Sequence, residues 1–98
     1  MGFKSIRSEV IKKLKEGNIQ HELRKQIELK NQLSTGEKTP EDVIKMLTMC
    51  RGDQHTTEKH KDIASVDIHI FKPVIDGTKW YVKCYMIEPD VWFISVHD

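Results

Sequence analysis

This chain contains little cysteine, and it has no long apolar stretch. Two cysteines, Cys50 and Cys84, are too few for a disulfide scaffold, so a reducing compartment is expected. No uninterrupted apolar run is long enough to cross a membrane, and the first ten residues lack the apolar segment of a secretory signal. Ile6 stands where a myristoylation pattern requires Ser or Thr. We therefore expect a cytoplasmic protein with no membrane partner.

Size and composition indicate one small globular domain, expected to span residues 1–98. Apolar residues make up 38% of the chain and charged residues 32%, which supports a small core. The formal net charge of +1 is unevenly distributed. Residues 1–51 carry eleven Lys and Arg against seven Asp and Glu, whereas residues 52–98 carry five against eight, with four of the five histidines. The basic half suits a partner with phosphates, but the small net charge argues against tight nonspecific DNA binding. The basic residues expected to form an RNA or acidic-partner surface are Lys12, Lys13, Lys15, Arg24 and Lys25.

Hydrophobic spacing predicts three helices, over about 5–16, 19–33 and 40–50. In the first helix, apolar residues recur at three-to-four spacing, and a Gly-Asn pair follows as a stop. The third has the strongest start, because Thr39 offers a capping hydroxyl and Pro40 fits the first helical position. Together these segments form a helical part over about 5–50.

The second half changes its period. A polar segment over about 51–64 predicts a loop, with room for a short edge strand. Beyond it, alternation at period two predicts an antiparallel meander over about 65–98, with strands at 65–72, 79–87 and 91–97. The dipeptide ending at Gly77 is a tight-turn signal between the first two strands. This order predicts an α+β fold, with N-terminal helices packed on one face of a C-terminal antiparallel sheet.

Alternation along the strands assigns their side chains to two faces. The apolar face is predicted to hold Val66, Ile68, Ile70, Trp80, Val82, Cys84, Met86, Trp92, Ile94 and Val96. The opposite face is predicted to hold Asp67, His69, Phe71, Lys79, Tyr81, Lys83, Tyr85, Phe93, Ser95 and His97. The second set offers cations for phosphate, rings for base stacking and imidazoles for proton transfer. A tyrosine or lysine on an exposed strand is more often an ordinary strand residue, so the set carries more weight than any member.

Three other patterns in the chain do not indicate a functional site. Cys50, His55 and His60 follow a C-x4-H-x4-H spacing that matches no common zinc site, so no metal is expected. The tripeptide 51–53 spells an adhesion motif but is expected to be a turn. Cys84 is assigned to the core as packing.

Five segments of the chain resemble MqsR-type toxins. EVIKKLKEGNI (9–19) and VIKML (43–47) resemble the helical half of that family. DIHIFKP (67–73), DGTKWYVKCYMI (76–87) and DVWFISVH (90–97) resemble its strands. In both, a strand ends in aromatic-basic-Pro, a glycine turn leads to Tyr-x-Lys, and Asp-Val opens the last strand.

The resemblance implies a RelE-like fold and a metal-independent endoribonuclease, an mRNA interferase that binds RNA and serves as the toxin of a toxin–antitoxin pair. It implies a cognate antitoxin as partner and no small-molecule cofactor. Tyr81 falls on the family's active-site tyrosine, and His97 on its C-terminal basic residue. The loop lysine of the family has no clear counterpart within 54–56, and its strand glutamine falls on Ile68, next to His69. These departures imply one of two outcomes: the chain uses histidines where relatives use lysine and glutamine, or it has lost the activity.

RNA cleavage without metal requires a base for the 2′-hydroxyl proton, an acid for the leaving 5′ oxygen and positive charge near the phosphate. His69 and His97 are predicted to be the acid and the base, in either order. Lys83 is predicted to stabilise the phosphorane, with Lys79 as the alternative. Tyr81 is predicted to position the phosphate or to assist proton transfer.

Further residues are assigned to the surroundings of this site. His55 and His60 are predicted to reach it from the polar loop, as catalytic or substrate-binding groups. Lys79, Tyr85 and Phe71 are predicted to lie on the RNA or partner surface. The alternative function is a non-catalytic small RNA- or protein-binding module, such as a phage or plasmid factor.

Overall fold

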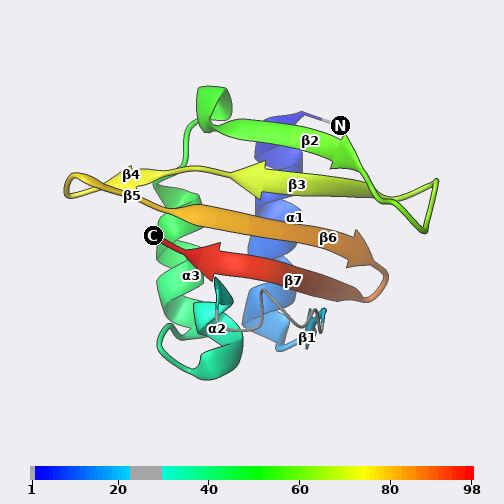
Figure 1. Cartoon of the computed structure of the whole chain (residues 1–98), viewed down its shortest axis with the longest axis horizontal. Coiled ribbons are helices and arrows are strands. Elements are labelled where there is room, and N and C mark those ends of the chain that lie inside the picture. Colours follow the sequence, from blue (N-terminus) through cyan, green and yellow to red (C-terminus); the bar gives the residue numbers. More distant parts are fainter. Residues whose placement is uncertain (1, 23–29) are drawn as a thin grey trace.

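The computed structural model of the chain describes residues 2–22 and 30–98, which form a mixed five-stranded sheet with two helices across one face (Figure 1). The helical elements are α1 (Phe3–Glu16), α2 (Gln32–Thr35), α3 (Pro40–Thr48) and the 3-10 turn η2 (Gly52–Gln54). The strands are β1 (Ile19–His21), β2 (His55–Lys59), β3 (Asp67–Phe71), β4 (Val74–Ile75), β5 (Thr78–Lys79), β6 (Tyr81–Ile87) and β7 (Asp90–His97).

The first and third predicted helices are confirmed. α1 buries its apolar stripe and ends at Gly17, whose φ of 75° lies in the left-handed region that glycine adopts without steric cost. α3 begins with a capping box, in which Thr39 and Asp42 each accept a hydrogen bond from the other's main-chain N–H. Pro40 occupies its first position, as predicted. In the described part of the chain, no helix is long and apolar enough to cross a membrane.

The second predicted helix, over 19–33, is wrong at its start. Residues 19–21 form β1, which runs parallel to β7. The Glu22 N–H donates to Phe93 O, and the Val91 N–H donates to Asn18 O, so the main chain satisfies the otherwise open edge of β7. At the other end the short helix α2 begins at Gln32, and residues 23–29 of the predicted helix lie outside the described residues.

The strands lie in the order β1-β7-β6-β3-β2. The predicted antiparallel meander of β3, β6 and β7 is confirmed, and β2 adds an antiparallel edge strand within the polar segment. Because β1 is parallel, the sheet is mixed and not purely antiparallel. β4 and β5 form a separate hairpin, whose turn places Asp76 and Gly77 at φ of 50° and 80°, as a tight two-residue hairpin requires.

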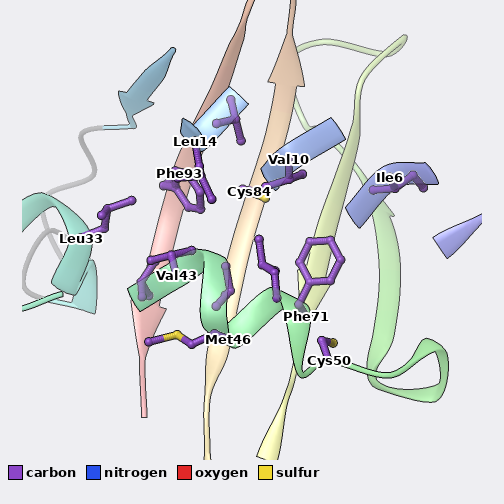
Figure 2. Packing of buried hydrophobic residues seen from close by; sticks show 14 residues of the cluster. Ile6, Val10, Leu14, Leu33, Val43, Met46, Cys50, Phe71, Cys84 and Phe93 are labelled. Carbon is purple, nitrogen blue, oxygen red and sulfur yellow. The ribbon is translucent and has the colours of Figure 1, made fainter. Parts of the chain in front are cut away.

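The larger core lies between the sheet and the helices α1 and α3 (Figure 2). We call the face that they cover the helix face, and the opposite one the second face. Val82, Cys84 and Val96 lie on the helix face, as alternation predicts. Phe71 and Phe93 also lie there, fully buried, although the sequence placed them on the opposite face.

Strand register explains the error in β3. His69 pairs with Cys84, and Phe71 pairs with Val82, so both share the helix face with those two residues. Ile68 and Ile70 consequently lie on the second face. A shift of one residue in register exchanges the two faces of a strand, and hydrophobic alternation does not fix that register.

A β-bulge explains the error in β7. The pairing shifts between Lys83 and Cys84, and Ile94 is the extra residue on β7. The bulge reverses alternation on one side of it. Trp92 and Ile94 therefore lie on the second face with Tyr85, whereas Val96 and His97 keep their predicted faces.

The second face carries a smaller apolar cluster. Its buried members are Ile68, Ile70, Tyr85 and Ile94, with Val66, Tyr81 and Trp92 packed against them. Tyr81, the first residue of β6, connects this cluster to the end of the sheet.

Candidate functional site

Tyr81 and His97 form a ring pair at the end of the sheet where β6 begins and β7 ends, beside the β4–β5 hairpin (Figure 1). The two residues are direct cross-strand partners, so their side chains leave the same face together. Their rings stack with centroids 5.1 Å apart and planes 24° apart. Both side chains are only half-buried. The structure thus brings together two of the four predicted catalytic residues.

One hydrogen bond defines the tautomer of His97. Its Nδ1 lies 3.0 Å from the main-chain oxygen of Asp98, which can only accept a hydrogen bond. Nδ1 therefore carries the proton and donates it to that oxygen. In the neutral ring, Nε2 is then left with a free lone pair, which is the form that a general base requires.

Two exposed lysines lie beside this pair. The Nζ of Lys72 lies 5.9 Å from the centroid of the Tyr81 ring, and the Lys72 N–H donates to Gln54 O over 2.8 Å, which anchors its backbone. Lys79, in β5, lines a pocket of about 420 Å³ together with Lys72 and Tyr81. The other residues lining this pocket are Asp53, Gln54, Thr56, Val74 and Trp80. We call Lys72, Lys79, Tyr81 and His97 the Tyr81 cluster.

Lys83 lies on the predicted face but is already paired. Its Nζ lies 2.8 Å from the Glu58 carboxylate, and its side chain is 19% exposed. The ion pair links β6 to β2 over the intervening strand β3. A carboxylate thus already neutralises this ammonium group, whereas Lys79, the sequence's alternative, and Lys72 are exposed beside Tyr81.

His69 does not lie with His97. Register places it on the helix face, opposite Cys84, whereas His97 lies on the second face opposite Tyr81. The two histidines project from opposite faces of strands that are two positions apart, a separation of about 10 Å across the sheet alone. The prediction that His69 remains on the open face is therefore wrong, and the predicted acid–base pair is not assembled.

His69 instead pairs with His55. The Nδ1 of His69 lies 3.2 Å from the Nε2 of His55, and their rings stack 5.3 Å apart. The His55 ring also stacks on Phe71 and contacts Phe3. Burial lowers the pKa of His55, and burial and then the neighbouring His55 lower the pKa of His69. This pair is thus held neutral within the core packing.

His60 is likewise structural in this arrangement. It is buried, and its Nδ1 accepts hydrogen bonds from the main-chain N–H groups of Asp62 and Ile63. Its ring lies nearly perpendicular to the Tyr85 ring, with the two centroids 4.7 Å apart. Tyr85 is 5% exposed and stacks on Trp92. His55 and His60 therefore do not project from a loop into the site, and Tyr85 and Phe71 are not surface residues, contrary to the sequence prediction.

The remaining candidates are placed as follows. Lys13 is buried and lies 2.9 Å from the Glu88 carboxylate, so it does not join the exposed Lys12 and Lys15 on the basic surface. Arg24 and Lys25 lie outside the described residues. Both cysteines are buried, and burial raises the pKa of Cys84 to about 12, as expected for an inert packing thiol. Within 2–22 and 30–98, no three His, Cys, Asp or Glu side chains are grouped to hold a metal ion.

Sequence reasoning missed Lys72 and the pocket that it lines. A signal was present, because Lys72 stands between the last strand residue of β3 and Pro73, in the aromatic-basic-Pro pattern of the family resemblance. Proline cannot continue the ladder, so the lysine before it marks a strand end, where side chains are free to gather. No family model, no curated protein and no solved structure matches this chain.

Proposed function

We propose that this protein is a metal-independent endoribonuclease that cuts mRNA at the Tyr81 cluster. One observation carries the proposal: a half-exposed imidazole with a free Nε2 stacks on a tyrosine beside two exposed lysines and a pocket. General base, hydroxyl and cations are the groups that RNA cleavage requires, and here they converge at one end of the sheet.

In the proposed reaction, the Nε2 of His97 takes the proton of the 2′-hydroxyl group. The 2′ oxygen then forms a bond to the adjacent phosphorus, and the bond from phosphorus to the 5′ oxygen breaks. The Tyr81 hydroxyl gives its proton to the leaving 5′ oxygen, and the proton held by His97 restores the tyrosine. Lys72 and Lys79 stabilise the added negative charge on the phosphorane. The products are a 2′,3′-cyclic phosphate and a 5′-hydroxyl end.

The family resemblance extends the proposal to a biological role. A RelE-like fold, the role of toxin in a toxin–antitoxin pair and a cognate antitoxin partner all follow from the resemblance of the strand segments to MqsR-type toxins. The order of helices before an antiparallel β3-β6-β7 meander is compatible with that resemblance. Tyr81 and His97, the two residues that the resemblance singles out, are the ones that stack together.

The test is cleavage of a short single-stranded RNA by the purified protein, with EDTA present. We expect products with 2′,3′-cyclic phosphate ends, unchanged rates with EDTA, and no cleavage when a 2′-deoxynucleotide stands at the cut position. A Tyr81→Phe, His97→Asn double variant provides the matched inactive protein. Cleavage that requires a divalent metal, or that the double variant retains, would overturn the proposal.

Induced expression in bacteria tests the role of toxin. We expect growth arrest with cleaved transcripts for the chain as it stands, and normal growth for the double variant. RNA binding without cleavage, together with unaffected growth, would instead support the non-catalytic binding module.

A further inference from the structure

Trp80 lies between two pockets at the end of the sheet. It lines the pocket of the Tyr81 cluster, and it also lines a second pocket of about 170 Å³ against the start of α3. Its main-chain N–H donates to Pro73 O over 2.9 Å, which fixes it at the base of the β4–β5 hairpin. The indole ring is half-buried and packs in part against the larger core. One aromatic ring therefore joins the candidate site to a neighbouring hollow.

The second pocket is rich in lysine. The Nζ of Lys38 lies 5.0 Å from the centroid of the Trp80 ring, and Lys45 lines the same pocket from α3. Asp42 also lines it, but its carboxylate accepts the Thr39 N–H, and that hydrogen bond is the main cause that lowers the pKa of Asp42. The two pockets together present four lysines against two aspartates. Such a surface favours a chain of phosphates.

We infer that Trp80 is a stacking platform for an RNA base next to the cleaved phosphodiester, with Lys38 and Lys45 holding the adjoining phosphate. The inference rests on the proposed function, because it extends the same RNA strand from the Tyr81 cluster around the end of the sheet. Trp80 lies between β5 and β6 and packs against the larger core, whereas Tyr81 packs against the cluster on the second face, so the two rings contact the RNA on two sides of that end. Single-stranded RNA is bound in this way, by aromatic rings under bases and cations along the backbone.

The bound base takes the position over the ring that the Lys38 ammonium group now occupies. Lys38 has a long flexible side chain on the loop before α3, and its main-chain N–H is held by Gln32 O. Its ammonium group can therefore move to the phosphate while its backbone stays in place. Stacking of one base on an aromatic side chain typically changes affinity by roughly ten- to a hundredfold, more than the contact of an exposed cation with a ring.

The experiment pairs loss of the ring with loss of the base. Binding is measured with a seven-nucleotide RNA whose cleavage position is 2′-deoxy, and with a series in which one nucleotide at a time is abasic. We expect one abasic position to weaken binding to the wild-type protein by about tenfold or more. In Trp80→Leu, which keeps an apolar side chain for the core, the same abasic RNA and the intact RNA should bind equally.

Three controls make the test specific. Trp92→Phe, on the second face and stacked on Tyr85, should preserve the difference between intact and abasic RNA. In that variant Trp80 is the remaining tryptophan, and the intact RNA should quench its fluorescence more than the abasic RNA does. Lys38→Ala should keep the preference for the base but reduce the dependence of binding on salt by about one phosphate.

The outcomes separate the two levels of the argument. Suppose that the protein binds and cleaves RNA, but the abasic position weakens binding equally in the wild-type protein and in Trp80→Leu. That result would overturn the stacking platform and leave the proposed endoribonuclease standing. Absence of RNA binding by the wild-type protein would overturn both. Loss of the base preference only in Trp80→Leu, with circular dichroism unchanged, supports the platform.

Discussion

Two stacked ring pairs near one end of the sheet each contain a histidine, but they lie on different faces and among different neighbours. Tyr81 and His97 stack on the second face, half-exposed, with lysines and a pocket beside them. His55 and His69 stack on the helix face, against the phenylalanine rings of the core. His97, half-exposed beside two lysines, is therefore a candidate catalyst, whereas His69, buried against Phe71, is a packing group.

Burial accounts for the chemical difference between the pairs. The first pair is half-exposed and has two exposed lysines beside it, so a phosphate group can approach the pair and bind to these cations. In the second pair the two imidazoles share a hydrogen bond, and burial lowers the pKa of both rings. Variants that separate the two pairs therefore provide the strongest tests.

The largest effect is expected from His97→Asn. Removal of the general base should lower kcat/KM for RNA cleavage by about 10²- to 10⁴-fold, with little change in stability because the ring is partly exposed. Cleavage rate and urea unfolding measure the two quantities. His69→Asn is the matched control, and its kcat should be unchanged once the protein is confirmed as folded. An equal loss of rate in both variants would contradict the separation of the pairs.

A smaller effect is expected from Tyr81→Phe, which removes one hydroxyl and keeps the stacked ring. Loss of this proton donor should lower kcat by about 10²-fold while KM changes little. Tyr85→Phe removes the corresponding hydroxyl from the same strand and face, four residues further along β6. That control should retain full activity, and a loss of rate there would move the chemistry toward the middle of the sheet.

The pair of His55 and His69 should affect the stability of the fold. His69→Asn breaks the hydrogen bond to His55 and should lower the free energy of unfolding by about 1–3 kcal/mol at neutral pH. In the wild-type protein, the unfolded chain binds protons near the ordinary histidine pKa of 6.5, whereas the folded pair, with its lowered pKa values, does not. The free energy of unfolding should therefore fall as pH drops through that value.

Urea unfolding at about pH 7.5 and about pH 5.5 checks this sign. The double variant His55→Gln, His69→Asn should lose less stability between the two values than the wild-type protein, because two of the groups that bind protons only on unfolding are gone. An unchanged difference would show that these two imidazoles are protonated alike in the folded and unfolded chain.

Local patterns predicted those parts of the fold that depend on local physics. Capping at Thr39, the stripe of α1 and the Gly77 turn follow from side chains within a few residues of one another. The antiparallel meander also followed from its period and turns. β1 was missed because its strand conformation comes from parallel pairing with β7, about seventy residues away in the sequence.

The candidate site was predictable only where register happened to agree with alternation. Tyr81 and His97 pair between the bulge at Ile94 and the end of the sheet, where the register agrees with alternation, so their predicted face is correct. His69 and Phe71 belong to β3, whose register against β6 reverses their faces. Register and bulges depend on packing across the whole sheet, so hydrophobic alternation within one strand does not reveal them.

The smallest effect is expected at Lys83. Variants of this lysine test whether it binds phosphate or serves only as the structural partner of Glu58. Its ion pair with Glu58 is partly exposed, because the Glu58 side chain is 48% accessible. Lys83→Met and Glu58→Gln should each change stability by less than about 1 kcal/mol, with a coupling in the double variant of about 0.5 kcal/mol that weakens at high salt.

Cleavage should stay within about twofold of wild type in all three proteins, whereas Lys72→Met should lower it by roughly 10²-fold or more. If Lys83→Met instead lowered cleavage as strongly as Lys72→Met while Glu58→Gln did not, Lys83 would leave Glu58 for the phosphate during the reaction. The catalytic surface would then extend two residues further along β6, and Glu58 would be the group that holds this lysine when no RNA is bound.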